Sequence, residues 1–138
     1  MDFSASVLLR QRGLKETLPR LSVLRVLAAS AKPLLVKDIL HLVRRKEGSI
    51  GLVTVYRVIE ALAQTGLLHR HPIDGGYSLC AIPDIDGHHV LLRCTACGRS
   101  EEAHDHDLCR REDAVARRVG FRTSHHLTEM LGTCSHCH

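Results

Sequence analysis

The chain has 138 residues, a formal net charge of +4 and a hydrophobic content of 44%. This length holds one or two small domains, and with two Phe, two Tyr and no Trp their cores must be built from aliphatic side chains. No apolar run approaches the ~20 residues of a membrane span, and the N-terminus lacks the layout of a signal peptide, so we expect a cytoplasmic protein with no membrane partner.

Charge and histidine content divide the chain into two halves. Residues 1–80 carry 12 Lys or Arg against 6 Asp or Glu, whereas residues 81–138 carry 7 against 9. Eight of the eleven histidines lie at or after His88. A basic half suggests binding to a polyanion when a matching motif accompanies it.

Apolar residues recur at three- and four-residue steps in three segments of the first half, which predicts three amphipathic helices. The first begins at Thr17, a candidate N-cap followed by a proline in the first turn, and ends before Pro33. The second covers 35–45, and the third extends from a cap at Ser49 to about Gln64.

Two short strands, over 67–70 and 77–80, flank a glycine-containing turn and predict a hairpin. Three helices followed by a hairpin is the layout of a winged helix, whose last helix enters the major groove of DNA while the hairpin lies along the backbone. The alternative on pattern alone is a helical bundle with an appended hairpin.

The second half predicts a small α/β domain behind a short acidic linker. Its expected elements, in chain order, are two strands, a helix and a third strand, over 88–94, 99–103, 107–119 and 121–131. We therefore predict an α+β protein with a DNA-binding domain over 1–81, a hinge linker over 82–87 and a metal-binding domain over 88–138.

Two CxxC pairs are the most informative feature of the chain. Cys94 and Cys97 form the first pair, and Cys134 and Cys137 form the second. Each pair can bind Zn²⁺ from a tight turn, and two pairs complete a closed tetrahedral site with no open position for catalysis. The gap of 36 residues exceeds the roughly 15–20 of a minimal zinc ribbon, so we predict a structural zinc that ties two ends of one domain together.

The alternatives for these cysteines are a redox CxxC and a pair of disulfides. A redox CxxC belongs at the start of a helix after a strand and needs no second copy. Six cysteines without an export signal instead favour a reducing compartment and metal-bound thiolates. An enzyme with a small-molecule substrate is not expected, because the chain has no HExxH motif and no His-x-Glu motif of a zinc deaminase.

Taken in order, these motifs resemble the ferric uptake regulator (Fur) family of bacterial metal-sensing transcription factors. The matching segments are 12–15, Thr17, 19–20, 54–58, 66–68, Tyr77, Cys80, 88–89, both CxxC pairs, 120–121 and 125–126. The resemblance implies a homodimer with an N-terminal winged helix, a C-terminal dimerisation domain over 88–138 and metal at the hinge.

Within that family, the pattern resembles the zinc uptake regulator (Zur) branch. Iron-sensing members place a Glu where this chain has Ser78, whereas here a cysteine stands two residues on, at Cys80. A thiolate suits Zn²⁺ better than Fe²⁺ or Mn²⁺. The resemblance implies one regulatory zinc per chain besides the structural one, held by His69, Cys80, Glu102 and one of the adjacent pair His88 and His89. Counting back from Cys94 along the strand favours His89, and counting forward from Cys80 favours His88.

The resemblance further implies operator DNA as the partner and a zinc-dependent repressor of zinc-uptake genes as the function. An iron- or peroxide-responsive regulator of the same family is the alternative. The residues expected at the DNA are Thr54, Tyr56 and Arg57 on the third helix, with Lys15, Arg20, Lys37 and Arg70 as phosphate contacts.

Two other groups of metal-binding residues remain. His126 is available for an additional metal site that some relatives have, with Cys109 at the position of the carboxylate ligand and Glu112 one turn on. The run over 101–107 is rich in donors, and we interpret its two histidines, His104 and His106, as residues of a solvated loop.

Overall fold

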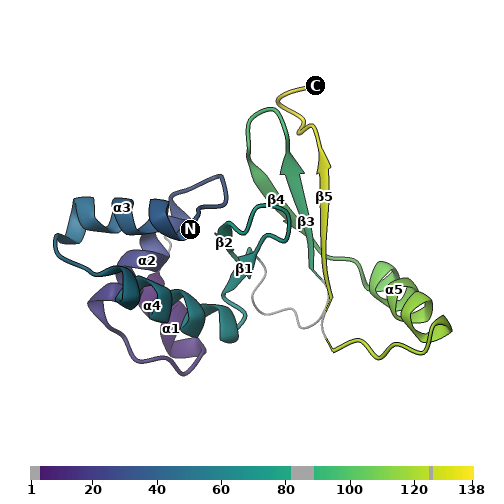
Figure 1. The fold of residues 1–138 in the computed structure, drawn as a ribbon, viewed down its shortest axis with the longest axis horizontal. Helices are drawn as coiled ribbons and strands as arrows, with labels where there is room; N and C mark the ends of the chain where they lie inside the picture. Colours follow the sequence, from purple (N-terminus) through teal and green to yellow (C-terminus); the bar gives the residue numbers. More distant parts are fainter. Residues whose placement is uncertain (1–3, 82–88, 125) are drawn as a thin grey trace. The chain divides into compact units, whose positions relative to one another are not determined.

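The computed structural model describes residues 4–81, 89–124 and 126–138 (Figure 1). The chain divides into two compact units, Met1–Cys80 and Ala81–His138. The described elements are α1 (Ala5–Gln11), α2 (Leu18–Ala28), α3 (Val36–Glu47), α4 (Leu52–Gln64), β1 (Leu68–Arg70), β2 (Tyr77–Leu79), β3 (His89–Cys94), β4 (Ser100–Ala103), α5 (His106–Arg118) and β5 (Leu127–Gly132). None of the helices among these residues combines the length and hydrophobicity that crossing a bilayer requires.

The first unit packs its helices around an aliphatic core and adds a two-stranded antiparallel sheet. Leu24 of α2, Ile39 of α3 and Leu62 of α4 have no exposed surface. The hairpin is fixed to the helical layer because Tyr77 and Leu34 exchange two backbone hydrogen bonds, of 2.9 and 2.8 Å. The predicted three helices and hairpin are present as α2–α4 and β1–β2.

Two helix starts differ from the predictions. The additional helix α1 has only seven residues, which is too short to show a repeating apolar pattern, and it begins at Ser4, whose side chain accepts a hydrogen bond from Val7 N. Thr17 caps α2 as predicted. The predicted cap Ser49 is wrong, because α4 begins two residues later, after Gly51, and no side chain caps it.

The second unit is built on a three-stranded sheet in the order β4-β3-β5. The central strand β3 pairs antiparallel with β4 and parallel with β5. Helix α5 connects the two outer strands and begins at Asp105, whose carboxylate accepts a hydrogen bond from Leu108 N at 3.0 Å. All residues of α5 are described and none of them is buried, so its apolar side chains do not contribute to a closed core within this chain.

The last strand is shorter than predicted at its start, since it begins at Leu127 and not near 121. Gly120 has a φ of +74° and donates to Arg117 O, while Phe121 donates to Ala116 O at 2.9 Å. These paired bonds are the Schellman motif, which satisfies the last carbonyls of a helix. Phe121 therefore belongs to the end of α5 and not to the sheet.

Candidate metal centres and nucleic-acid surface

The two CxxC pairs lie at the same edge of the sheet because β3 and β5 run in parallel. Cys94 ends β3 opposite Gly132 at the end of β5, and Cys134 follows two residues later. The four sulfur atoms of the pairs all lie within 4.8 Å of one another, with Cys97 Sγ and Cys134 Sγ 3.8 Å apart. The structure thus brings together the four predicted ligands of the structural zinc.

The electrostatics of this cluster suit a divalent cation. The backbone N–H groups of Cys134 and Cys97 donate to Cys94 Sγ at 3.4 and 3.5 Å, and these bonds lower the pKa of Cys94 to about 6. The neighbouring sulfurs of Cys134 and Cys97 raise the pKa of Cys137 to about 12. One cysteine of the set thus ionises readily, whereas further negative charge is unfavourable unless a cation compensates it. Zn²⁺ binds thiolates and supplies that compensating charge.

We predict that Cys97→Ser abolishes folding of the second unit around zinc. Structural zinc sites contribute on the order of 10 kcal/mol of apparent folding free energy, comparable with the ~5–15 kcal/mol stability of a whole protein. Zinc content after chelator treatment, measured by mass spectrometry, should fall by one ion per chain. Cys109→Ser, which alters a cysteine outside the pairs, is the control and should retain that ion. A stable Cys97→Ser protein with full zinc would contradict the assignment.

In the first unit, the hairpin presents two of the predicted regulatory ligands on one face. His69 lies opposite Ser78 in the β1–β2 register, and Cys80 N donates to Leu67 O at 2.8 Å, which continues the ladder by one position. Because alternate residues of a strand share a face, His69 and Cys80 are diagonal neighbours on the same side of the hairpin. Both are buried, and His71 on this face bonds Ser78 Oγ through Nε2 at 2.8 Å.

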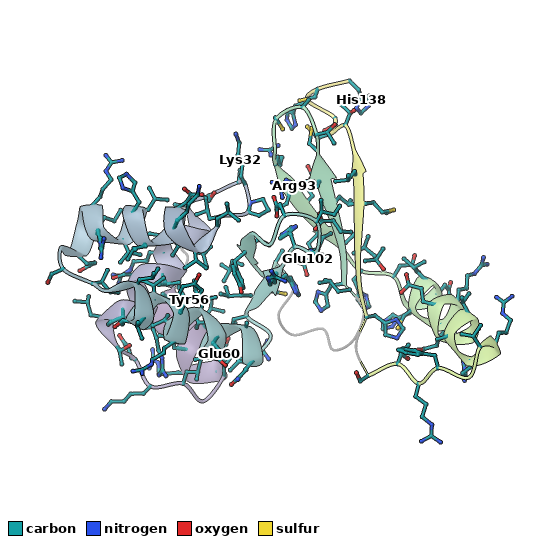
Figure 2. All side chains as sticks on the ribbon, in the orientation of Figure 1. Lys32, Tyr56, Glu60, Arg93, Glu102 and His138 are labelled. Atoms are coloured by element: carbon teal, nitrogen blue, oxygen red, sulfur yellow. The ribbon has the colours of Figure 1, made fainter. Side chains whose placement is uncertain are left out.

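In the second unit, the β3–β4 ladder brings together the other two predicted ligands. Glu102 lies opposite Leu91, and His89 precedes Leu91 by two residues, so His89 and Glu102 share a face. His89 Nδ1 bonds Glu102 Oε1, and Ala81 N donates to Glu102 Oε2 at 2.8 Å. Figure 2 shows the position of Glu102 on this sheet. Of the two candidate histidines, His89 is therefore beside Glu102, whereas His88 lies outside the described residues.

A third cluster of metal-binding residues joins α5 to the start of β5. The donor atoms of Cys109, Asp113 and His126 lie within 4.8 Å of one another. His126 Nε2 is 2.8 Å from Asp113 Oδ1, and its Nδ1 is 3.2 Å from Glu112 Oε2. The sequence had singled out Cys109, Glu112 and His126 but missed Asp113. The helical step of four residues from Cys109 to Asp113 is the signal that could have found it.

Within this cluster, the pKa of His126 is raised and the pKa of Asp113 is lowered. The hydrogen bond of His126 to Glu112 and the charge of Asp113 raise the pKa of His126 from its ordinary value of 6.5. The hydroxyl of Thr123 and the adjacent His126 lower the pKa of Asp113 below 3.8. Burial, Asp113 and Glu112 raise the pKa of the Cys109 thiol. Protonation of His126 is consequently more favourable than that of a free imidazole, and the ring ties α5 to the residues before β5 through Glu112 and Asp113.

We predict that this tie is strongest at pH values between the lowered pKa of Asp113 and the raised pKa of His126. The stabilisation from His126 is complete below pH 6.5 and is lost as pH rises through its raised pKa, while that from Asp113 is complete above pH 3.8 and is lost on acidification below it. An NMR titration of the zinc-loaded protein should place the His126 midpoint above 6.5. Glu112→Gln should lower that midpoint. A wild-type midpoint at or below 6.5 would refute this electrostatic account.

The residues predicted to meet DNA are spread over the surface of the first unit. On α4, Val55 and Ile59 face the core, whereas Thr54, Tyr56 and Arg57 are exposed, Tyr56 by 54%. The predicted phosphate contacts Lys15, Lys37 and Arg70 are exposed, while Arg20 is half-buried and donates to Lys15 O at 2.6 Å. The helix thus offers a hydroxyl, a phenol and a guanidinium to a partner outside the unit.

Residues 11–131 match the Ferric uptake regulator family. The chain belongs to this family. It is 36% identical over 130 residues to the ferric uptake regulation protein of Legionella pneumophila, an alignment that covers 94% of this chain and 95% of the relative. The Fur family consists of metal-responsive transcriptional regulators and is not an enzyme family. The predicted family and fold class are thereby confirmed.

Two solved structures are also similar to the chain. One is a zinc uptake regulator complexed with zinc and DNA, with 28% identity, a TM-score of 0.86 and coverage of 96% of this chain and 89% of that chain. The other is holo XcZur, with 27% identity, a TM-score of 0.85 and coverage of 96% and 94%. The Fur-family relatives of this chain thus include proteins named for iron and proteins named for zinc.

Proposed function

We propose that this protein is a zinc-responsive transcriptional regulator that represses zinc-uptake genes by binding operator DNA as a zinc-loaded homodimer. Each chain would hold two Zn²⁺ ions, one structural and one regulatory. The structural ion would be held by the four cysteines of the CxxC pairs. The regulatory ion would be held by His69 and Cys80 of the first unit and by His89 and Glu102 of the second.

The observation that carries the choice of zinc is the thiol of Cys80. It lies buried on the same hairpin face as His69, in the position after β2. Thiolate and imidazole ligands suit Zn²⁺, whereas Fe²⁺ and Mn²⁺ favour oxygen-rich shells. The similarity to two zinc uptake regulator structures supports the same choice.

An iron- or peroxide-responsive regulator is the second candidate. The curated Legionella relative carries the name ferric uptake regulation protein and is 36% identical, which exceeds the 28% of the zinc-bound structure. Identity over the whole chain, however, reports shared ancestry, while metal choice depends on a few ligand atoms. We therefore weigh Cys80 above the overall identity.

The proposed homodimer is supported by apolar surface on the second unit. Exposed apolar side chains occur on and after α5 and on β5, although a soluble chain gains from burying them. They are Val115, Val119, Phe121, Met130 and Leu131. A second copy of the chain is the occupant that the family resemblance implies, with 88–138 as the dimerisation domain and 1–81 as the DNA-binding domain.

The regulatory ligands divide between two units, and this division is the basis of the proposed switch. His69 and Cys80 belong to the hairpin that follows α4, the proposed recognition helix. His89 and Glu102 belong to the sheet of the other unit. Shared coordination would restrict the angle between the units and, in a dimer, the separation of two recognition helices. Operator half-sites with a fixed spacing then match only one arrangement. The free energy that couples zinc binding to DNA binding depends on how much more tightly zinc binds this arrangement than the others, and it is typically ~1–3 kcal/mol.

We predict that two basic residues affect DNA binding in different ways. Arg57→Ala on α4 should cost roughly 1–3 kcal/mol and relax base preference at one position, because Arg can pair bidentately with guanine. Lys37→Ala should weaken binding evenly and reduce the dependence on salt, as loss of a phosphate contact does. Arg118→Ala, at the exposed end of α5, is the control. Gel-shift titrations over salt and operator variants test this, and unchanged binding by both variants would exclude α4 from the groove.

We predict that Cys80→Ser separates regulation from folding. The variant should remain a folded dimer with its structural zinc, because Cys80 lies outside the CxxC pairs, but it should lose zinc-dependent operator binding. Fluorescence anisotropy with labelled operator over a buffered zinc series measures the response. Cys109→Ser is the matched control, since it removes a thiol outside the proposed site and should respond normally.

Two outcomes would overturn the proposal. A Cys80→Ser protein that responds normally to zinc removes the regulatory assignment. Activation of the wild type by Fe²⁺ and not by Zn²⁺, at matched free metal, would favour the iron-responsive candidate. Because the two binding equilibria are linked, operator DNA must also increase the affinity for zinc by the same factor by which zinc increases the affinity for DNA.

A further inference from the structure

The turn between β4 and α5 carries two histidines that lie next to His89. The antiparallel register ends with Val90 opposite Ala103, and His89 and His104 are the next residues along the two segments. The rings of His89 and His104 have centroids 6.3 Å apart, and those of His104 and His106 are 4.4 Å apart with an interplanar angle of 88°. Three imidazoles therefore form a continuous row within the second unit.

The row extends from a buried position to the surface. His89 is 7% exposed, His104 is half-buried and His106 is exposed. His104 follows the last residue of β4 directly, two residues after Glu102. An ion in solution thus meets His106 first, then His104, and only then the buried pair of His89 and Glu102.

The backbone on both sides of this turn is anchored. Ala103 is held in the β3–β4 ladder, and the carboxylate of Asp105 caps α5 through Leu108 N. His104 and His106 stand on either side of that cap. Their rings are consequently held near each other by structure that does not depend on a metal.

The chemistry of the turn favours a divalent transition metal. Imidazole suits Zn²⁺, Ni²⁺ and Cu²⁺. The run over 101–107 also contains four carboxylates against no Lys or Arg, which raises the local concentration of cations. Two imidazoles leave the remaining coordination positions to water, so an ion held here exchanges more readily than one held by four protein ligands.

We propose that His104 and His106 form an accessible zinc-loading site that passes Zn²⁺ to His89 and Glu102. The proposal rests on the regulatory role assigned to His89 and Glu102 above, and it replaces the interpretation of His104 and His106 as residues of a solvated loop. The histidine pair acts on the rate at which the regulatory site fills and leaves the affinity of that site unchanged.

The test compares zinc uptake by three forms of the full-length protein, each with its structural zinc in place, in stopped-flow competition with a fluorescent zinc chelator. The double variant H104A/H106A should load the regulatory zinc about tenfold more slowly than the wild type, within the range by which local steering changes association rates. Its equilibrium zinc affinity and operator response should be those of the wild type. H41A, which removes an exposed imidazole from α3 of the other unit, is the control and should load at the wild-type rate.

A second measurement is independent of the regulatory function. In a His89→Ala protein, paramagnetic Co²⁺ should still shift the backbone amide NMR signals of residues 104–106, and these shifts should vanish when His104 and His106 are both alanine. If Co²⁺ shifts the signals at the histidine pair but the wild type takes up no regulatory zinc, the proposed function is refuted, and the pair is still a metal site. Unchanged loading by H104A/H106A, or a loss of equilibrium affinity instead of rate, would overturn the loading role.

Discussion

The parallel pairing of β3 with β5 is the constraint on which the second unit depends. It places Cys94 opposite Gly132 and so brings two CxxC turns, separated by 36 residues, to one edge of the sheet. Thr95 N donates to Gly132 O at 2.9 Å and extends the pairing into the first turn. The buried apolar side chains here are few, chiefly Val90 and Leu91, and a unit with so small a core needs another source of stability. On the proposed function, zinc bound by the four cysteines would supply it.

Strand alternation explains how metal-binding side chains gather in pairs. His69 and Cys80 share one face of the hairpin, and His89 and Glu102 share one face of the sheet. Each pair has only two ligands, so neither resembles the closed set made by the cysteines. On the proposed function, this incompleteness is what makes the regulatory ion exchangeable, because its retention depends on the arrangement of both units.

Helix α5 is attached to the sheet by polar contacts and not by a buried apolar face. Glu112 accepts a hydrogen bond from Thr128 at 2.8 Å, and His126 lies between Glu112 and Asp113. Val115 on α5 and Val119 directly after it remain exposed. A helix held in this way keeps its hydrophobic surface available for a second chain, which agrees with the proposed homodimer.

The sequence by itself determined the α+β class, the order of the elements from α2 onward, the four cysteines of the CxxC pairs and the exposed polar face of α4. These follow from local chemistry: the period of apolar residues, the Thr17 cap and the CxxC spacing are all readable over a few positions. Only the tertiary structure decided what depends on residues distant in sequence. It paired His89 with Glu102, placed Asp113 beside His126 and set His104 against His89. Strand register and helix packing create these contacts, and neither is encoded in the short spacings from which a sequence is interpreted.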